Sequence, residues 1–303
     1  MSAVPADRPV DKTRPVDKPR RGRGSGGSNV ALSRNGKRAL TVFFVAFLIF
    51  LYVPTALLII FSFNNSTVAA FPLAGLTTKW YHQAFGSQEI RSALLNSLKV
   101  ATACGVFATI IGVMVSYPLA RRKVWFRSGI SALLLLPLVV PTVVLGVSLL
   151  ILFQRGFVHV PLGLGAVLIA HVIIAIPFCV LLILPRLASI DRRLEEAAFD
   201  LGAGGFTTFR RIVLPLIIPA ILSAFLIAFV VSIDEVVVAS FLVSNEVTYP
   251  IYLYSGLKFP EKTQTLIPVA TEMILLSFLL AFLAEGLRRV GERRVGIETP
   301  TGT

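Results

Sequence analysis

The sequence predicts an all-α membrane protein with six transmembrane helices. Of its 303 residues, 55% are hydrophobic and only 15% are charged, with a mean hydropathy of +0.80. A soluble domain is about one quarter charged, so this chain has too few polar side chains to cover its apolar surface in water, and lipid is the predicted solvent. The apolar runs are continuous and do not alternate, which argues against a transmembrane barrel.

Six windows are long enough to cross a membrane, because a helix needs about 20 apolar residues to span about 30 Å of hydrocarbon. They are Leu40–Phe63, Val100–Ala120, Gly129–Phe153, Leu162–Pro185, Ile212–Ile233 and Thr265–Ala284. Only the last window contains a charged residue, Glu272. Prolines fall within several windows (Pro137, Pro141, Pro177 and Pro219), and membrane helices tolerate proline because neighbouring groups can satisfy the freed carbonyls.

The basic residues of the loops predict the orientation, since loops on the cytoplasmic side are enriched in Lys and Arg. With the N-terminus inside, the inner loops hold Arg121, Arg122, Lys123, Arg127, Arg186, Arg192, Arg193, Arg210, Arg211, Arg288, Arg289, Arg293 and Arg294. The outer loops hold Lys79, Arg91, Arg155, Lys258 and Lys262. The asymmetry predicts that both termini are cytoplasmic.

The chain divides into a basic N-terminal tail at 1–38, a transmembrane domain at 39–290 and a short cytoplasmic tail at 291–303. The N-terminal tail is rich in Pro, Gly, Arg and Asp and has almost no large apolar residues, so we expect it to be disordered. A tail with no specific partner is the simplest interpretation; contact with anionic lipid is an alternative that we favour over nucleic-acid binding. Cys104 and Cys179 lie inside apolar windows and indicate neither a disulfide nor a metal site.

A connection of 26 residues, Arg186–Arg211, separates the fourth and fifth windows. An ordinary connection would need only a few residues. Asp191 is placed to cap a short helix, and Gly202 is placed to end it in the left-handed conformation. The chain then resumes as FTTFRRIVLP and enters the fifth window, where we expect Pro215 to bend the entry. These features predict a small helical hairpin on the cytoplasmic side.

One face of the predicted first helix is charged and another is apolar. Glu196 is four residues from Arg192 and four from Asp200, a spacing that places all three on one helix face. Ala197, Ala198 and Leu201 form a smooth apolar strip. Such a hairpin is shaped to insert into a partner protein.

The hairpin resembles the EAA loop of the permease subunits of ATP-binding-cassette importers. The pattern consists of Glu196, Ala197, Ala198, Gly202, Ile212, Leu214 and Pro215. The resemblance implies a type I importer permease fold in the bacterial inner membrane. It also implies that these residues form a coupling helix that docks on a separate ATPase, which binds ATP and magnesium.

The chain itself lacks the motifs of an enzyme. The segment ALSRNGKR has Ala31 and Arg38 where a phosphate-binding loop requires Gly and Ser or Thr. HExxH, GxSxG and spaced Cys/His sets are also absent. We therefore expect no catalytic residue, no metal and no cofactor in this chain, with ATP hydrolysis on the partner.

A narrower resemblance links most of residues 40–290 to the second permease subunit of spermidine/putrescine importers. It is carried by LTTKWY at 76–81, LEEAAFDLGA at 194–203, SIDEVVVASF at 232–241 and PIYLYSGLK at 250–258. The resemblance implies a polyamine cargo, pairing with a homologous permease subunit, two ATPase subunits and an extracytoplasmic solute-binding protein. Iron, thiosulfate, molybdate or a phosphonate as cargo remain alternatives within the family, and a secondary transporter is an alternative outside it.

Three carboxylates are candidates for the cargo pathway. Counting from Ile212, Asp234 and Glu235 fall near the outer edge of the hydrocarbon, about 33 Å along the helix. Glu272 lies about 10 Å from the outer end of the sixth window. Charged residues within a membrane face a cavity or a partner, and carboxylates would attract a polyamine. The alternative is that they reach the interface or pair with Lys258 and Lys262.

Aromatic residues at the start of the second span have two interpretations. Trp80, Tyr81 and Phe85 fit an interfacial anchor. A cage for a cationic ligand is the alternative that we favour less.

Overall fold

The computed structural model describes residues 34–122, 127–156 and 159–293. Of the predicted tails, residues 1–33 and 294–303 lie outside this part. Residues 34–38, which the sequence placed in the disordered tail, are the start of a helix, and residues 291–293 are the end of one. The chain divides into two compact units, and the boundary between them in the sequence falls between Val53 and Pro54, inside helix α1. Each unit is considered by itself, and the arrangement described below is that of the second unit.

The described residues are almost entirely helical and contain no β-strand, apart from one isolated bridge between Asn64 and Leu76. The helices are α1 (Arg34–Ser62), α2 (Lys79–Gly86), α3 (Gln88–Arg121), α4 (Arg127–Val139), α5 (Thr142–Arg155), α6 (Leu164–Ser189), α7 (Arg193–Asp200), α8 (Gly205–Thr208), the π-helical turn η1 (Phe209–Val213), α9 (Leu214–Asp234), α10 (Val237–Leu242), α11 (Tyr249–Gly256) and α12 (Pro260–Arg293). All six predicted apolar windows are helical, and five lie in helices long enough to cross a membrane. The all-α prediction is confirmed.

The predicted third span differs from the prediction, because it is two helices and not one. Helices α4 and α5 meet at an angle of 105°, and the break falls at Val140 and Pro141. Proline disfavours helical geometry in the residue before it and supplies no N–H to continue the ladder. Pro141 therefore ends one helix and precedes the first residue of the next.

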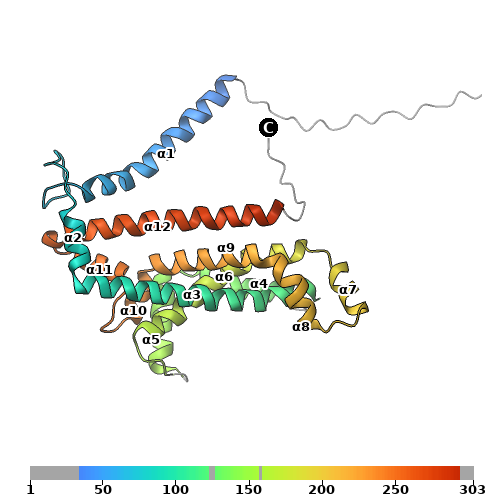
Figure 1. The fold of residues 1–303 in the computed structure, drawn as a ribbon. Helices are drawn as coiled ribbons and strands as arrows, with labels where there is room; N and C mark the ends of the chain where they lie inside the picture. The colour runs from blue at the N-terminus through green and yellow to red at the C-terminus, as the bar shows by residue number, and fades with distance from the viewer. Residues whose placement is uncertain (1–33, 123–126, 157–158, 294–303) are drawn as a thin grey trace, which may run out of the picture. The chain divides into compact units, whose positions relative to one another are not determined.

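The bent pair carries the chain across the bundle. The guanidinium of Arg121, at the end of α3, donates a hydrogen bond to the carbonyl of Ile190, just after the end of α6. Helices α3 and α6 therefore end at the same side and run parallel, so the chain between them has to return to the other side. The α4–α5 pair is thus a broken crossing. We name the side that holds α7 the hairpin end and the opposite side the far end (Figure 1).

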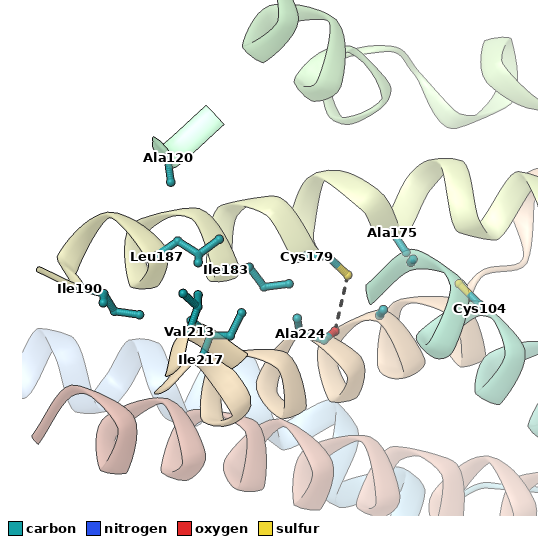
Figure 2. Packing of buried hydrophobic residues seen from close by; sticks show 12 residues of the cluster. Cys104, Ala120, Ala175, Cys179, Ile183, Leu187, Ile190, Val213, Ile217 and Ala224 are labelled. Atoms are coloured by element: carbon teal, nitrogen blue, oxygen red, sulfur yellow. Dashed lines mark hydrogen bonds between the residues drawn. The ribbon is translucent and has the colours of Figure 1, made fainter. Parts of the chain in front are cut away.

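Helices α3, α6 and α9 pack side by side and form the main core. Small residues line their contacts, and the Sγ of Cys179 on α6 lies 3.7 Å from the carbonyl oxygen of Ala224 on α9 (Figure 2). A Cβ added to Gly112 on α3 would lie 2.7 Å from the Cβ of Cys179. Small side chains allow close backbone approach, which drives helix association in membranes where water does not.

Helix α12 packs antiparallel to α9. The hydroxyl of Ser223 on α9 donates a hydrogen bond to the carbonyl of Ala284 on α12 (2.8 Å), and Asp234, eleven residues further along α9, lies beside Ser277, seven residues earlier on α12. Helix α12 therefore ends at the hairpin end, like α3 and α6.

At the far end, aromatic residues join short helices to the long ones. The backbone N–H of Tyr249 donates to the hydroxyl of Ser97 on α3, and its own hydroxyl donates to the carbonyl of Leu266 on α12, both at 2.8 Å. Trp80, predicted as an interfacial anchor, is buried, and its indole N–H donates to the carbonyl of Asn64. Phe85 is exposed and remains available for contact with lipid.

Candidate coupling hairpin and membrane carboxylate

Helix α7 ends as the sequence predicted, but its N-cap is Arg192 and not the predicted Asp191. A carboxylate oxygen of Asp191 accepts the N–H of Arg193, the first residue of the helix (3.0 Å). At the other end Gly202 has a φ of +82°. The N–H of Gly202 donates to the carbonyl of Phe199, and the N–H of Ala203 donates to that of Ala198. This pair of bonds is a Schellman motif, which requires the left-handed residue that glycine supplies most readily.

Helices α7 and α8 and the turn between them expose a surface that is partly charged and partly apolar. Glu196 and Ala197 are exposed, as are the large apolar side chains Phe199, Leu201 and Phe206. We name these five residues the hairpin surface. Leu201 is 89% exposed and Phe206 is 76% exposed. Exposed apolar groups gathered on a polar segment indicate a protein contact.

The structure divides the predicted motif residues between this surface and the interior. Ala198 is buried, so it does not belong to the exposed apolar strip that the sequence predicted. Gly202 and Pro215 are exposed, whereas Ile212 and Leu214 are half-buried. Sequence reasoning missed Phe199 and Phe206 as parts of the surface, although their position beside the motif was a usable signal.

The return from the hairpin passes through η1. The N–H of Leu214 donates to the carbonyl of Phe209, five residues earlier. A π turn at this point precedes Pro215, whose ring and missing N–H would disrupt a regular α-helical turn. The ring of Phe209 packs edge-on against Tyr117 of α3, with centroids 5.2 Å apart.

Glu195, beside the motif glutamate, points the other way. It is buried, and its Oε1 lies 2.6 Å from the Nε of Arg121 on α3. Its Oε2 accepts the hydroxyl of Tyr117 (3.0 Å). The two adjacent glutamates thus have different environments, because Glu195 is paired inside the protein and Glu196 is exposed.

Asp234 is the last residue of α9, and its carboxylate is exposed. Both carboxylate oxygens lie 3.4 Å from the hydroxyl of Ser277 on α12. The stretch of α12 between Lys262 and Glu285 contains no charge except Glu272. Ser277 lies within about 5 Å of the middle of that stretch, at about 1.5 Å per residue. Asp234 is therefore level with the middle of the apolar part of α12 and not with its outer edge.

Two hollows flank this carboxylate. One has a volume of about 290 Å³ and is lined by Asp234, Val236, Tyr249, Pro250, Leu253, Tyr254, Leu257, Ala270, Met273 and Ile274. The other, of about 380 Å³, is lined by Val230, Asp234, Ile274, Ser277, Phe278 and Ala281. A single carboxylate between apolar walls suits a ligand that carries a positive charge on an alkyl chain.

The other two predicted carboxylates have different surroundings. The Oε1 of Glu235 accepts the N–H of Val238 (2.9 Å) at the start of α10, so this side chain caps a helix. Glu272 is exposed and lines neither hollow. It lies about 200° around α12 from Ala270, a lining residue, at about 100° per residue.

A larger hollow, of about 970 Å³, lies at the far end beside the start of α3. It is lined by Ser87, Gln88, Glu89, Ser92, Ala93, Leu95, Asn96, Lys99, Asn245, Glu246, Val247 and Tyr252. The hydroxyl of Tyr252 donates to Glu89 (2.9 Å). Sequence reasoning missed this polar surface because its two halves are about 150 residues apart in the chain. Among the described residues, no group of three or more His, Cys, Asp or Glu side chains could hold a metal ion.

The comparisons with known proteins agree with this architecture. Residues 108–297 match the family described as "Binding-protein-dependent transport system inner membrane component". The chain belongs to this family. It is therefore an inner-membrane transport permease, as the resemblance of the hairpin motif implied.

Curated relatives cover most of this permease. The spermidine/putrescine transport system permease protein PotC of Escherichia coli is 33% identical over 82% of this chain and 92% of its own length. The putrescine transport system permease protein PotI of the same organism is 35% identical over 69% of this chain and 76% of its own length.

A solved structure has the same fold. A permease of a bacterial alginate ABC transporter, crystallised in complex with an alginate pentasaccharide-bound periplasmic protein, superposes with a TM-score of 0.60. It is 19% identical, and the match covers 88% of this chain and 96% of the other. This likeness concerns the fold of the permease, and the cargo has to be argued from the chain itself and its curated relatives.

Proposed function

We propose that this permease imports polyamines, with the energy supplied by a separate ATPase. The observation that carries the proposal is the similarity to PotC and PotI along most of the chain, because both of these relatives are named for polyamine cargo. The complete transporter contains a second, homologous permease subunit, two ATPase subunits that bind ATP and magnesium, and an extracytoplasmic solute-binding protein.

The hairpin end faces the cytoplasm and docks on the ATPase in this proposal. The basic residues of the predicted inner loops support this orientation. The hairpin surface supports the docking, since it combines an exposed glutamate with exposed apolar side chains on a short, capped helix. Glu196 and Ala197 are the motif residues of this surface, and Ala198, Gly202, Ile212, Leu214 and Pro215 hold the hairpin in shape.

Asp234 is the residue of the cargo pathway in this proposal. A cation that leaves water for the middle of a membrane loses much of its solvation, and a carboxylate at the same depth offsets part of that loss. The apolar walls beside Asp234 accommodate the methylene groups between two amines. An anionic cargo would be repelled here. Glu235 supports the pathway indirectly by capping α10, and Glu272 is a weaker candidate because it lines neither hollow.

Uptake of radiolabelled spermidine and putrescine tests the proposal directly. The measurement compares cells that lack this chain and all other polyamine importers with the same cells that express the complete transporter. We expect uptake only in the second strain, and loss of that uptake when ATP is depleted. Equal uptake in the two strains would discard the polyamine cargo, and uptake that survives ATP depletion would discard the ATPase.

Replacement of Glu196 by Ala tests the docking surface. Loss of a hydrogen bond to a charged group costs about 1.5 kcal/mol, so we expect transport to fall about tenfold at an equal amount of inserted protein. The amount of ATPase that co-purifies with the permease should fall with it. Glu261→Ala, the same change at the far end, serves as the control. Normal co-purification and transport in the Glu196 variant would remove this residue from the docking surface.

A further inference from the structure

The buried contact between Glu195 and Arg121 joins the hairpin to the longest helix of the core. Both side chains are only 9% exposed. Arg121 also donates to the carbonyl of Ile190, and Arg192 donates to the carbonyl of Ala120 (2.7 Å). The first turn of α7 and the residues just before it are therefore held on the end of α3. One arginine of each segment donates a hydrogen bond to a backbone carbonyl of the other.

Tyr117 extends this attachment by one turn along α3. Its hydroxyl donates to Glu195, while its ring packs against Phe209 in η1, where the chain leaves the hairpin. The entry and the exit of the hairpin are thus tied to the same turn of α3. A displacement of α7 by a docked partner would pull on α3 and could not be absorbed by a loose loop.

Helix α3 connects the hairpin to the far end of the bundle. From Arg121 to Ser97 it covers about 36 Å at 1.5 Å per residue. There the hydroxyl of Ser97 accepts the N–H of Tyr249, and the side-chain amide of Asn96 donates to the carbonyl of Val247 (3.2 Å). Tyr249 lines the hollow that contains Asp234. One continuous helix therefore contacts the hairpin at one end and the wall of the carboxylate hollow at the other.

We infer that Arg121 and Glu195 are positioning residues that transmit movement of the hairpin through α3 to the hollow at Asp234. This inference rests on the proposed function, because it requires an ATPase that moves the hairpin. It gives the two adjacent glutamates separate roles. Glu196 faces the partner, and Glu195 converts the partner's movement into a displacement of α3. Breaking this buried ion pair should have a large effect, because removal of one member leaves the other charge buried and unpaired.

The test uses the complete transporter, purified from cells that co-express all of its subunits. A cysteine introduced as Tyr254→Cys reports on the hollow, since Tyr254 is 63% exposed and the native cysteines, Cys104 and Cys179, are completely buried. The rate of alkylation is measured with and without ATP. This readout needs no cargo, so it separates failure of the coupling inference from failure of the polyamine proposal.

We expect Glu195→Gln to reduce the ATP-dependent change in alkylation about fivefold or more, the usual lower range of coupling between two sites. The ATPase should still co-purify in a normal amount with this variant, whereas the co-purifying amount should fall in Glu196→Ala. The charge-exchanged variant Arg121→Glu with Glu195→Arg should recover part of the ATP-dependent change, because the ion pair is restored in reverse while the bonds to Ile190 and Tyr117 are lost.

An ATP-dependent change in Glu195→Gln equal to that of the parent would overturn the inference. If Glu195→Gln does not fold, the exchanged pair decides: a folded exchanged variant without any ATP-dependent change would also overturn it. A folded exchanged variant that responds to ATP would support it. A parent that transports no polyamine but responds to ATP at Tyr254→Cys would leave the inference standing and discard only the cargo.

Discussion

Replacement of Asp234 by Asn is expected to reduce polyamine uptake at least about tenfold, which corresponds to about 1.4 kcal/mol. Asn has nearly the same size as Asp and keeps the contact with Ser277 possible, so the change removes the charge with little effect on packing. The effect should be large because charge interactions at this depth are poorly screened by water. The measurement is the initial rate of spermidine uptake at matched amounts of inserted protein.

Glu272→Gln is the matched control for this prediction. It neutralises a carboxylate at a similar depth on the neighbouring helix that lines neither hollow, and we expect a smaller loss of uptake than in Asp234→Asn. If uptake in Asp234→Asn remained close to that of the unsubstituted permease, the cargo pathway would have to lie elsewhere. The larger hollow with Glu89 and Glu246 would then be the next region to test.

The second large effect is expected from Gly112→Leu. A Cβ at Gly112 would lie 2.7 Å from the Cβ of Cys179 and 3.5 Å from the backbone carbonyl carbon of the same residue. Neither atom can move without a shift of α6, so α3 and α6 have to separate. Overpacking of this kind costs about 3 kcal/mol. We expect a large loss of thermal stability, measured in detergent by the temperature at which the purified permease aggregates.

Gly286→Leu on α12 is the control for the packing effect, because a Cβ at Gly286 would meet nothing within 4 Å. A smaller change offers a rescue: Gly112→Ala should be partly compensated by Cys179→Gly, which removes the clashing atom. Equal stability of the Gly112 and Gly286 leucine variants would show that the contact between α3 and α6 is looser than the structure indicates.

The apolar windows could be found from the sequence because lipid imposes a simple requirement. A helix that crosses hydrocarbon needs a long run of apolar residues, so composition alone locates it. The hairpin could be found for a similar reason, since a long connection with a capping Asp191 and a terminating Gly202 has few alternatives. Gly202 has the predicted left-handed backbone, whereas the N-cap of α7 is Arg192, and Asp191 accepts the N–H of Arg193 from one residue further out.

The break at Pro141 could not be predicted with the same ease. Pro137, Pro177 and Pro219 lie within helices α4, α6 and α9 that continue past them, whereas the chain breaks at Pro141. Whether a membrane helix continues through a proline depends on how neighbouring groups satisfy the freed carbonyls. That is a property of the packed bundle and not of the local sequence.

The depth of Asp234 in the membrane also could not be obtained by counting residues along the fifth span. Counting from Ile212 assumed that the fifth span begins at the membrane surface and runs straight across. In the structure, helical geometry already begins at Gly205, and the level of Asp234 is given by its neighbour Ser277 on α12. A side-by-side contact between two helices locates a residue in a way that distance along one helix does not.

Glu195 shows a third kind of limit. In the sequence it is one of two equivalent glutamates, and its partner Arg121 lies 74 positions earlier, directly after the second apolar window. The spacing of residues within α7 predicts which side chains share a face, but it contains no information about which face meets α3. The ion pair emerges only when the ends of α3 and α6 are brought together.

The bend between α4 and α5 has a consequence for how the chain enters the membrane during synthesis. Each half is 13 or 14 residues long, which gives about 20 Å of helix, well short of the roughly 30 Å of hydrocarbon. Neither half can therefore be released into lipid as a stable span by itself. The insertion machinery has to hold α4 until α5 has emerged from the ribosome, and the packing partners of α5 include α10, which is made much later. The third crossing of this permease is thus completed after later crossings have been synthesised.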